Sequence, residues 1–167
     1  MDQVFAQLLS AEDQKVLDAL VIVEQQGDAR AIRPLLHALA GSSDQQVRQR
    51  ITNMLYQVKV SAAVPELVAA LDEDGLRSVR RTVLSTFWNA GLDVKDHLEI
   101  LIGCAIEGDA EECFECLTVI EHQELWPEKD ARLALKRVER FLPTEKDAYK
   151  AALLGDLAAL LRDRLGA

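Results

Sequence analysis

Apolar residues recur along the chain at helical spacing, and one segment of the pattern occurs twice. The segments 30–39 (RAIRPLLHAL) and 62–71 (AAVPELVAAL) carry apolar residues at matching positions, 32 residues apart. The matched residues are Ile32, Leu35, Leu36 and Leu39 in the first copy and Val64, Leu67, Val68 and Leu71 in the second. Repeats of this length that consist of helix pairs are typical of solenoids. The pattern therefore predicts an all-α solenoid.

A second match at the same offset supports this interpretation. It joins a helical pattern in the second repeat to one in the third, with Val47, Arg48, Ile51, Leu55 and Tyr56 corresponding to Val79, Arg80, Val83, Phe87 and Trp88. The next helix of the third repeat aligns at 33 residues, with Leu67, Val68 and Leu71 corresponding to Ile100, Leu101 and Cys104. One additional residue in the turn at 91–93 accounts for the difference.

The helix start and stop signals give a complete set of elements. Helices are expected at about 2–9, 11–25, 29–40, 44–58, 62–71, from near 75 to 90, 94–107, 109–123, 128–142 and 144–165. Capping boxes are predicted at Ser10, Ser43 and Thr144, and an N-cap at Asp28. Residues 1–167 are therefore predicted to form a single domain of about four helical hairpins, with a capping helix at each end.

The repeat also carries a family signature. The pattern DxxVR (Asp44, Val47, Arg48), the turn Gly27-Asp28 and the following RAIRPLL resemble HEAT repeats over residues 13–104, in the short form found in bacterial and phycobilisome lyase-like chains. The resemblance implies a right-handed superhelix whose second helices line a concave binding groove. It also implies a ladder between repeats formed by Asp44, Arg48 and Arg80, interrupted where Leu76 replaces the aspartate of the third repeat.

On this arrangement, the non-core positions of the second helices form a candidate binding stripe. The stripe comprises Arg30, Arg33, His37, Glu66, Ala69, Lys95 and Glu99. Its mixture of basic, small and acidic residues favours a peptide or protein ligand over a phosphate track. The alternative is that these are ordinary solvated helix positions. Tyr56 and Trp88 form a candidate aromatic pair, which either anchors a partner or packs between repeats, and packing is favoured.

Charge adds a second candidate surface. The chain has a formal net charge of −9, and residues 93–128 alone hold eleven acids against Lys95, a segment charge of −10. Such a surface disfavours nucleic acid and favours a basic protein partner. The candidate docking residues are Glu107, Asp109, Glu111, Glu112 and Glu115. The alternative is that acids at helix starts simply complement the helix dipole.

No catalytic or metal-binding motif is evident, so we expect a non-catalytic module without a cofactor or metal. Cys113 and Cys116 share a CxxC spacing near His122, but they lie within a predicted helix, where buried small residues are the better explanation. The chain shows no leader and no apolar stretch long enough for a bilayer, which predicts a soluble cytoplasmic protein. An odd number of cysteines favours thiols over disulfides.

Two alternative functions stay open. The phycobilisome lyase resemblance implies a subunit that handles a tetrapyrrole, in which Cys104, Cys113 or a groove histidine would matter. A DNA glycosylase built on helical repeats would use a basic surface. That surface would contain Arg30, Arg33, Arg48, Arg77, Arg80 and Arg81.

Overall fold

The computed structural model describes residues 1–167 and is all-helical, which confirms the predicted fold class. The α-helices are α1 (Asp2–Leu8), α2 (Asp13–Gln26), α3 (Ile32–Gly41), α4 (Gln45–Tyr56), α5 (Ala63–Leu71), α6 (Arg80–Asn89), α7 (Leu98–Glu107), α8 (Ala110–His122), α9 (Glu128–Phe141) and α10 (Ala148–Leu165). Three short 3₁₀ helices are η1 (Ala29–Ala31), η2 (Asp74–Val79) and η3 (Leu142–Thr144).

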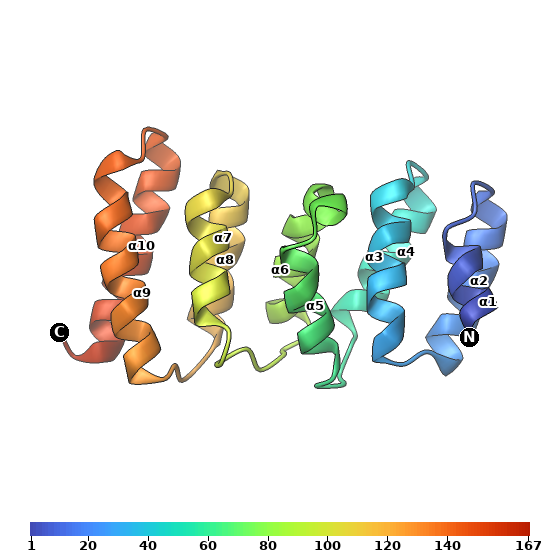
Figure 1. Ribbon diagram of the computed structural model, residues 1–167, viewed down its shortest axis with the longest axis horizontal. Helices are drawn as coiled ribbons and strands as arrows, with labels where there is room; N and C mark the ends of the chain where they lie inside the picture. Colours follow the sequence, from blue (N-terminus) through green and yellow to red (C-terminus); the bar gives the residue numbers. More distant parts are fainter. The chain divides into compact units, whose positions relative to one another are not determined.

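The helices fall into two compact units, an N-terminal unit of residues 1–92 and a C-terminal unit of residues 93–167. In the N-terminal unit, α1, α3 and α5 pack side by side in one layer, and α2, α4 and α6 form the other (Figure 1). Each helix of the first layer also packs against the next helix of the chain. This sequential packing of helix pairs is that of a HEAT-repeat solenoid.

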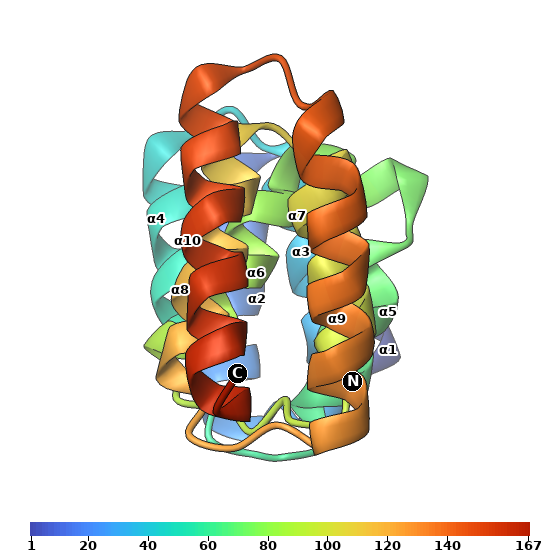
Figure 2. The same cartoon turned by 90° about the vertical axis from the view of Figure 1, so that its left-hand side faces the viewer.

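The C-terminal unit repeats the two-layer arrangement. Here α7 packs beside α9, and α8 packs beside α10. Figure 2 shows α9 and α10 side by side, and the two helices pack against each other. The single domain expected over residues 1–167 stays a prediction.

The repeated apolar positions form the core of the N-terminal unit. Leu36 and Leu67 are fully buried, as are Ile51 and Val83 of the other layer. Val68 is only half-buried, although its partner in the repeat, Leu36, is enclosed. The helix-pair spacing therefore predicts most of the buried positions, because each repeat covers its apolar face with its neighbour.

The helix starts differ from the prediction. The capping boxes expected at Ser10, Ser43 and Thr144 are not formed. Asp44 caps α4 instead, and Asp147 caps α10; each carboxylate accepts the backbone N–H three residues on, at 2.8 Å and 2.9 Å respectively. An ionised carboxylate is a stronger acceptor than a hydroxyl, so at α4 and α10 the aspartate that follows the predicted cap takes its place. Helix α2 has no side-chain cap.

The prediction of a ladder that joins Asp44 to Arg48 and Arg80 is also wrong. Arg48 donates from Nη1 to the carbonyl of Leu39 at 2.6 Å, and Arg80 donates from Nη2 to the carbonyl of Leu71 at 2.7 Å. Leu39 and Leu71 lie at equivalent places near the ends of α3 and α5. The arginines therefore satisfy carbonyl groups that a helix C-terminus leaves without a partner.

None of the helices combines the length and the apolar character needed to cross a membrane.

Candidate functional site

Two residues of the predicted stripe meet an acid that the sequence did not indicate. Arg33 and His37 lie one turn apart on α3, so their side chains share a face. Both reach Glu73 in the turn between α5 and η2: Arg33 forms an ion pair with one carboxylate oxygen, and His37 Nε2 lies 2.7 Å from the other. All three side chains are half-buried. We call this group the Glu73 cluster.

The cluster holds α3 against the following repeat. Gly75, just beyond Glu73, faces His37: a Cβ there would lie 3.9 Å from the imidazole Cε1. Because Glu73 already engages Arg33 and His37, those two side chains contribute to packing between repeats, and they are less available to a ligand. The sequence gives no signal for Glu73, which is 40 residues from Arg33.

The other stripe residues of the N-terminal unit do not join this group. Arg30 lies in η1, ahead of α3, and its guanidinium pairs with Asp28 at 2.8 Å. The hydrogen bond from the Arg30 side chain, with a second from its backbone N–H, lowers the pKa of the Asp28 carboxyl. Asp28 caps η1, as predicted. Glu66 is half-buried and Ala69 exposed, both on α5.

Lys95 and Glu99 are the stripe residues of the C-terminal unit. Lys95 does not lie on a helix as expected, because α7 begins at Leu98. The Asp93 carboxylate accepts a hydrogen bond from the backbone N–H of Lys95 at 3.0 Å. The side-chain oxygen of Gln123 accepts one from the backbone N–H of Val94, also at 3.0 Å. These bonds hold the segment in a turn. Glu99 is exposed in the first turn of α7.

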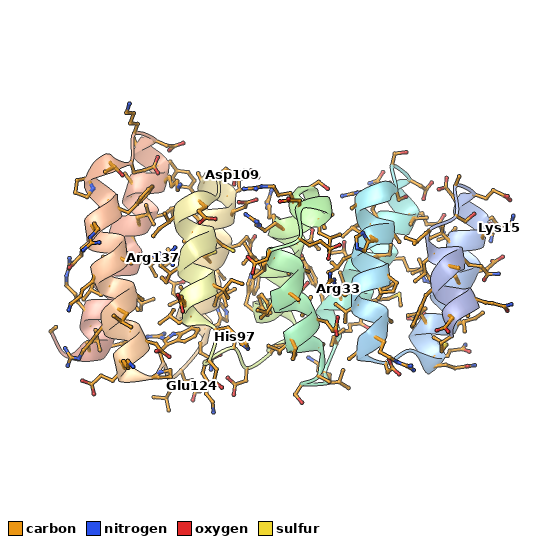
Figure 3. All side chains as sticks on the ribbon, in the orientation of Figure 1. Lys15, Arg33, His97, Asp109, Glu124 and Arg137 are labelled. Atoms are coloured by element: carbon orange, nitrogen blue, oxygen red, sulfur yellow. The ribbon has the colours of Figure 1, made fainter.

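The candidate acidic residues gather around the turn between α7 and α8. Glu107, Asp109 and Glu111 are exposed, and Glu112 is half-buried. Asp109, labelled in Figure 3, caps α8 by accepting the backbone N–H of Glu112 at 2.8 Å. Glu115 is different, because it is only 8% exposed. The acidic surface therefore consists of Glu107, Asp109, Glu111 and Glu112, and placing Glu115 on it was wrong.

Tyr56 and Trp88 lie in one layer of the N-terminal unit. The Tyr56 hydroxyl, at the end of α4, is 2.7 Å from the hydroxyl of Ser85 on α6. Trp88 follows Ser85 by one turn on the same helix, and both aromatic side chains are half-buried. The hydroxyl pair thus links two neighbouring repeats.

The three cysteines are buried and form no disulfide. Burial raises the pKa of the Cys113 thiol to about 11 and raises that of Cys116 as well. A buried protonated thiol is neither a good nucleophile nor a good metal ligand. No group of three or more histidine, cysteine or acidic side chains is arranged to hold a metal ion. The cysteines therefore fill space between helices.

The basic residues proposed for nucleic acid are also partly committed to the fold. Arg80 is 7% exposed and Arg48 is half-buried, and both donate to backbone carbonyls. Arg33 is held by Glu73. These contacts remove three of the six arginines from any basic surface.

Comparison with known proteins agrees with this architecture. Residues 1–87 match the family described as HEAT repeats. No match was found among curated proteins or among solved structures. HEAT repeats usually lack catalytic activity and generally mediate protein binding, whereas the phycobilisome lyase subtype is not confirmed. Because the matched region covers more than half of the 167 residues, the chain belongs to the HEAT-repeat family.

Proposed function

We propose that this chain is a non-catalytic interaction scaffold that binds a basic segment of a partner protein at the acidic surface of Glu107, Asp109, Glu111 and Glu112. One observation carries the proposal: exposed carboxylates gather at the turn between α7 and α8. No lysine or arginine of the C-terminal unit pairs with Glu107 or Asp109. Exposed carboxylates such as those of Glu107 and Asp109 attract a cationic partner and increase its association rate.

The wider charge distribution supports the same choice. The C-terminal unit holds 17 acidic and 10 basic residues, a net charge of −7 out of −9 for the chain. The candidate stripe of the N-terminal unit is less suited to docking, because the Glu73 cluster engages two of its residues. A tetrapyrrole would need an accessible thiol, whereas Cys104 and Cys113 are buried. Reduced thiols fit a reducing compartment such as the cytoplasm.

The test is a neutralising double variant, Glu107→Gln with Asp109→Asn. Asparagine retains the N-cap of α8, so the change removes charge and leaves the helix start intact. The probe is a fluorescein-labelled lysine-rich decapeptide. We expect binding by the parent at about 0.05 M salt that weakens at least tenfold at about 0.5 M, and weaker binding by the variant at low salt.

The matched control is Glu66→Gln with Asp72→Asn, which removes two charges from the N-terminal unit. If this control weakens binding and the acidic-surface variant does not, the decapeptide binds the N-terminal unit and not the acidic surface. If the decapeptide binds the parent equally at both salt concentrations, charge does not govern recognition and the proposal fails. Circular dichroism spectra of both variants check that the helices are retained.

A further inference from the structure

The C-terminal unit has a pocket between two helices of the same layer. Helices α7 and α9 lie side by side, and between them is a cavity of about 280 Å³. Its lining comprises Glu99 and Ile102 from α7 and Asp130, Leu133, Ala134 and Arg137 from α9. The pocket is separate from the acidic surface, since none of its residues belongs to that group.

The floor of the pocket is apolar and has an exposed edge. Ile102 is fully buried and Ala134 is 5% exposed, so the two form a closed apolar base. Leu133 stands beside them with 56% of its surface exposed. A large aliphatic side chain at the rim of an apolar cavity gains free energy when another apolar group covers it. The pocket can therefore accommodate an apolar side chain.

One end of the pocket is built by Arg137, which Figure 3 labels on α9. Its guanidinium lies across α7 at Gly103, where a Cβ would be 3.6 Å and 3.7 Å from its two terminal nitrogens. Nη1 also lies 3.4 Å from the carbonyl oxygen of Glu99. Glycine leaves room for the guanidinium, so Arg137 is held against the α7 backbone as a wall of the pocket.

The pocket also contains two carboxylates, those of Glu99 and Asp130. Glu99 is exposed and Asp130 half-buried, and no lysine or arginine of the C-terminal unit forms an ion pair with either. Two carboxylates therefore flank an apolar floor, against one guanidinium that already contacts the α7 backbone. A ligand that supplies a cation beside its apolar group would complement both features.

We propose that this pocket binds a short partner segment in which a large aliphatic side chain adjoins a lysine or arginine. The aliphatic group would cover Leu133 and Ile102, and the cation would meet Glu99 or Asp130. A cavity of about 280 Å³ has room for one aliphatic side chain. This inference rests on the proposed function as a protein-binding scaffold, but it concerns a different face.

Amide NMR spectra of the ¹⁵N-labelled full chain test the pocket directly. The probe is a hexapeptide with uncharged termini and a central Leu-Arg pair. It is compared with two hexapeptides in which the central pair is Ser-Arg or Leu-Glu. We expect the Leu-Arg peptide to shift the amides of Ile102, Gly103, Leu133 and Ala134. Each altered peptide should bind about tenfold more weakly, since about 1.4 kcal/mol of apolar or ionic contact corresponds to that factor.

Protein variants give the second measurement. Leu133→Ser should weaken binding of the Leu-Arg peptide about tenfold. Phe114→Ser, which changes an exposed apolar residue on α8, should not alter it. Equal binding of the Ser-Arg peptide, tighter binding of the Leu-Glu peptide, or shifts confined to residues outside α7 and α9 would each overturn the proposal.

The two proposals fail separately. Glu107→Gln with Asp109→Asn should weaken the lysine-rich decapeptide and leave the Leu-Arg hexapeptide unaffected, because the pocket contains neither acid. Leu133→Ser should weaken the Leu-Arg hexapeptide and leave the lysine-rich decapeptide unaffected. If one of these variants fails to weaken its own peptide while the other variant behaves as expected, the surface that carries the ineffective substitution was assigned wrongly.

Discussion

Replacing Arg80 with methionine tests the origin of stability in the N-terminal unit. Arg80 is 7% exposed and donates from Nη2 to the carbonyl of Leu71 at 2.7 Å, near the end of α5. Methionine retains most of the apolar stem and removes the donor. The carbonyl then loses a charged partner in a site that water reaches poorly, while the interaction of the guanidinium with the helix dipole is also lost.

The size of the effect follows from two opposing contributions. Loss of a hydrogen bond to a charged group costs about 1.5–3 kcal/mol. Arg80 Nε is itself buried without a hydrogen-bond partner, so its removal returns about 1 kcal/mol. The net expectation is a decrease of about 0.5–2 kcal/mol in the free energy of unfolding. Arg48→Met should cost more, because Arg48 donates to two carbonyls, those of Leu39 and Ser42, and leaves no buried nitrogen without a partner.

Urea unfolding monitored by tryptophan fluorescence measures this change. Each unit has one tryptophan, Trp88 in the first and Trp126 in the second, so a Trp126→Phe background reports from the N-terminal unit. Arg77→Met, an exposed position in η2, is the control and should stay within about 0.5 kcal/mol. If Arg80→Met also stays within that limit, the capping role assigned to the arginines is incorrect.

Three further predictions concern the C-terminal unit and the whole chain. Because burial raises the pKa of Cys113 to about 11, a thiol reagent at about pH 8 should label it at least a hundredfold more slowly in the folded protein than in urea. Hydrogen bonds from the Asp147 backbone and the Lys150 side chain lower the pKa of Glu145. The ionised Glu145 carboxylate therefore stabilises the fold at any pH above the ordinary pKa of a glutamate, and this stabilisation is lost as the pH falls through the lowered pKa. Glu145→Gln should therefore reduce the melting temperature at about pH 7 and have no effect at a pH below the lowered value; equal effects at both would refute this. If residues 1–167 form a single domain, Trp88 and Trp126 fluorescence should report coincident urea transitions, and separated transitions would show two domains.

The repeat period predicts the fold well because burial is encoded locally in each helix pair. The third repeat shows where this approach fails. Leu76 takes the place of the capping aspartate Asp44, and the structure has a 3₁₀ helix at 74–79 before α6 begins at Arg80. Val79 precedes α6 and offers no side-chain cap. Without an acceptor at the expected start, the first turn tightens and the α-helix begins later.

The candidate site was harder to predict because it depends on which elements meet. Arg33 and His37 follow from helical spacing, but Glu73 reaches them only once α5 and η2 stack on α3. Glu115 shows the reverse error. Helix α8 packs against both α7 and α10, so more of its circumference is covered than one apolar stripe indicates. Charge counting along the sequence cannot distinguish such an enclosed acid from an exposed one.

The use of cations at helix ends connects the fold to the proposed binding surface. In the C-terminal unit, Lys150 donates to the carbonyl of Ile106 at 2.6 Å, and Arg164 donates to the carbonyl of Glu121 at 2.8 Å. These are carbonyls at the ends of α7 and α8, the same role that Arg48 and Arg80 have in the N-terminal unit. A solenoid of short helices has many C-termini, and each favours a nearby cation. A lysine or arginine that binds a helix-end carbonyl contributes less to neutralising the acids at the surface. The negative charge of the C-terminal unit is thus partly a consequence of how its helices are capped, and this charge is the property on which the proposed binding of a basic partner depends.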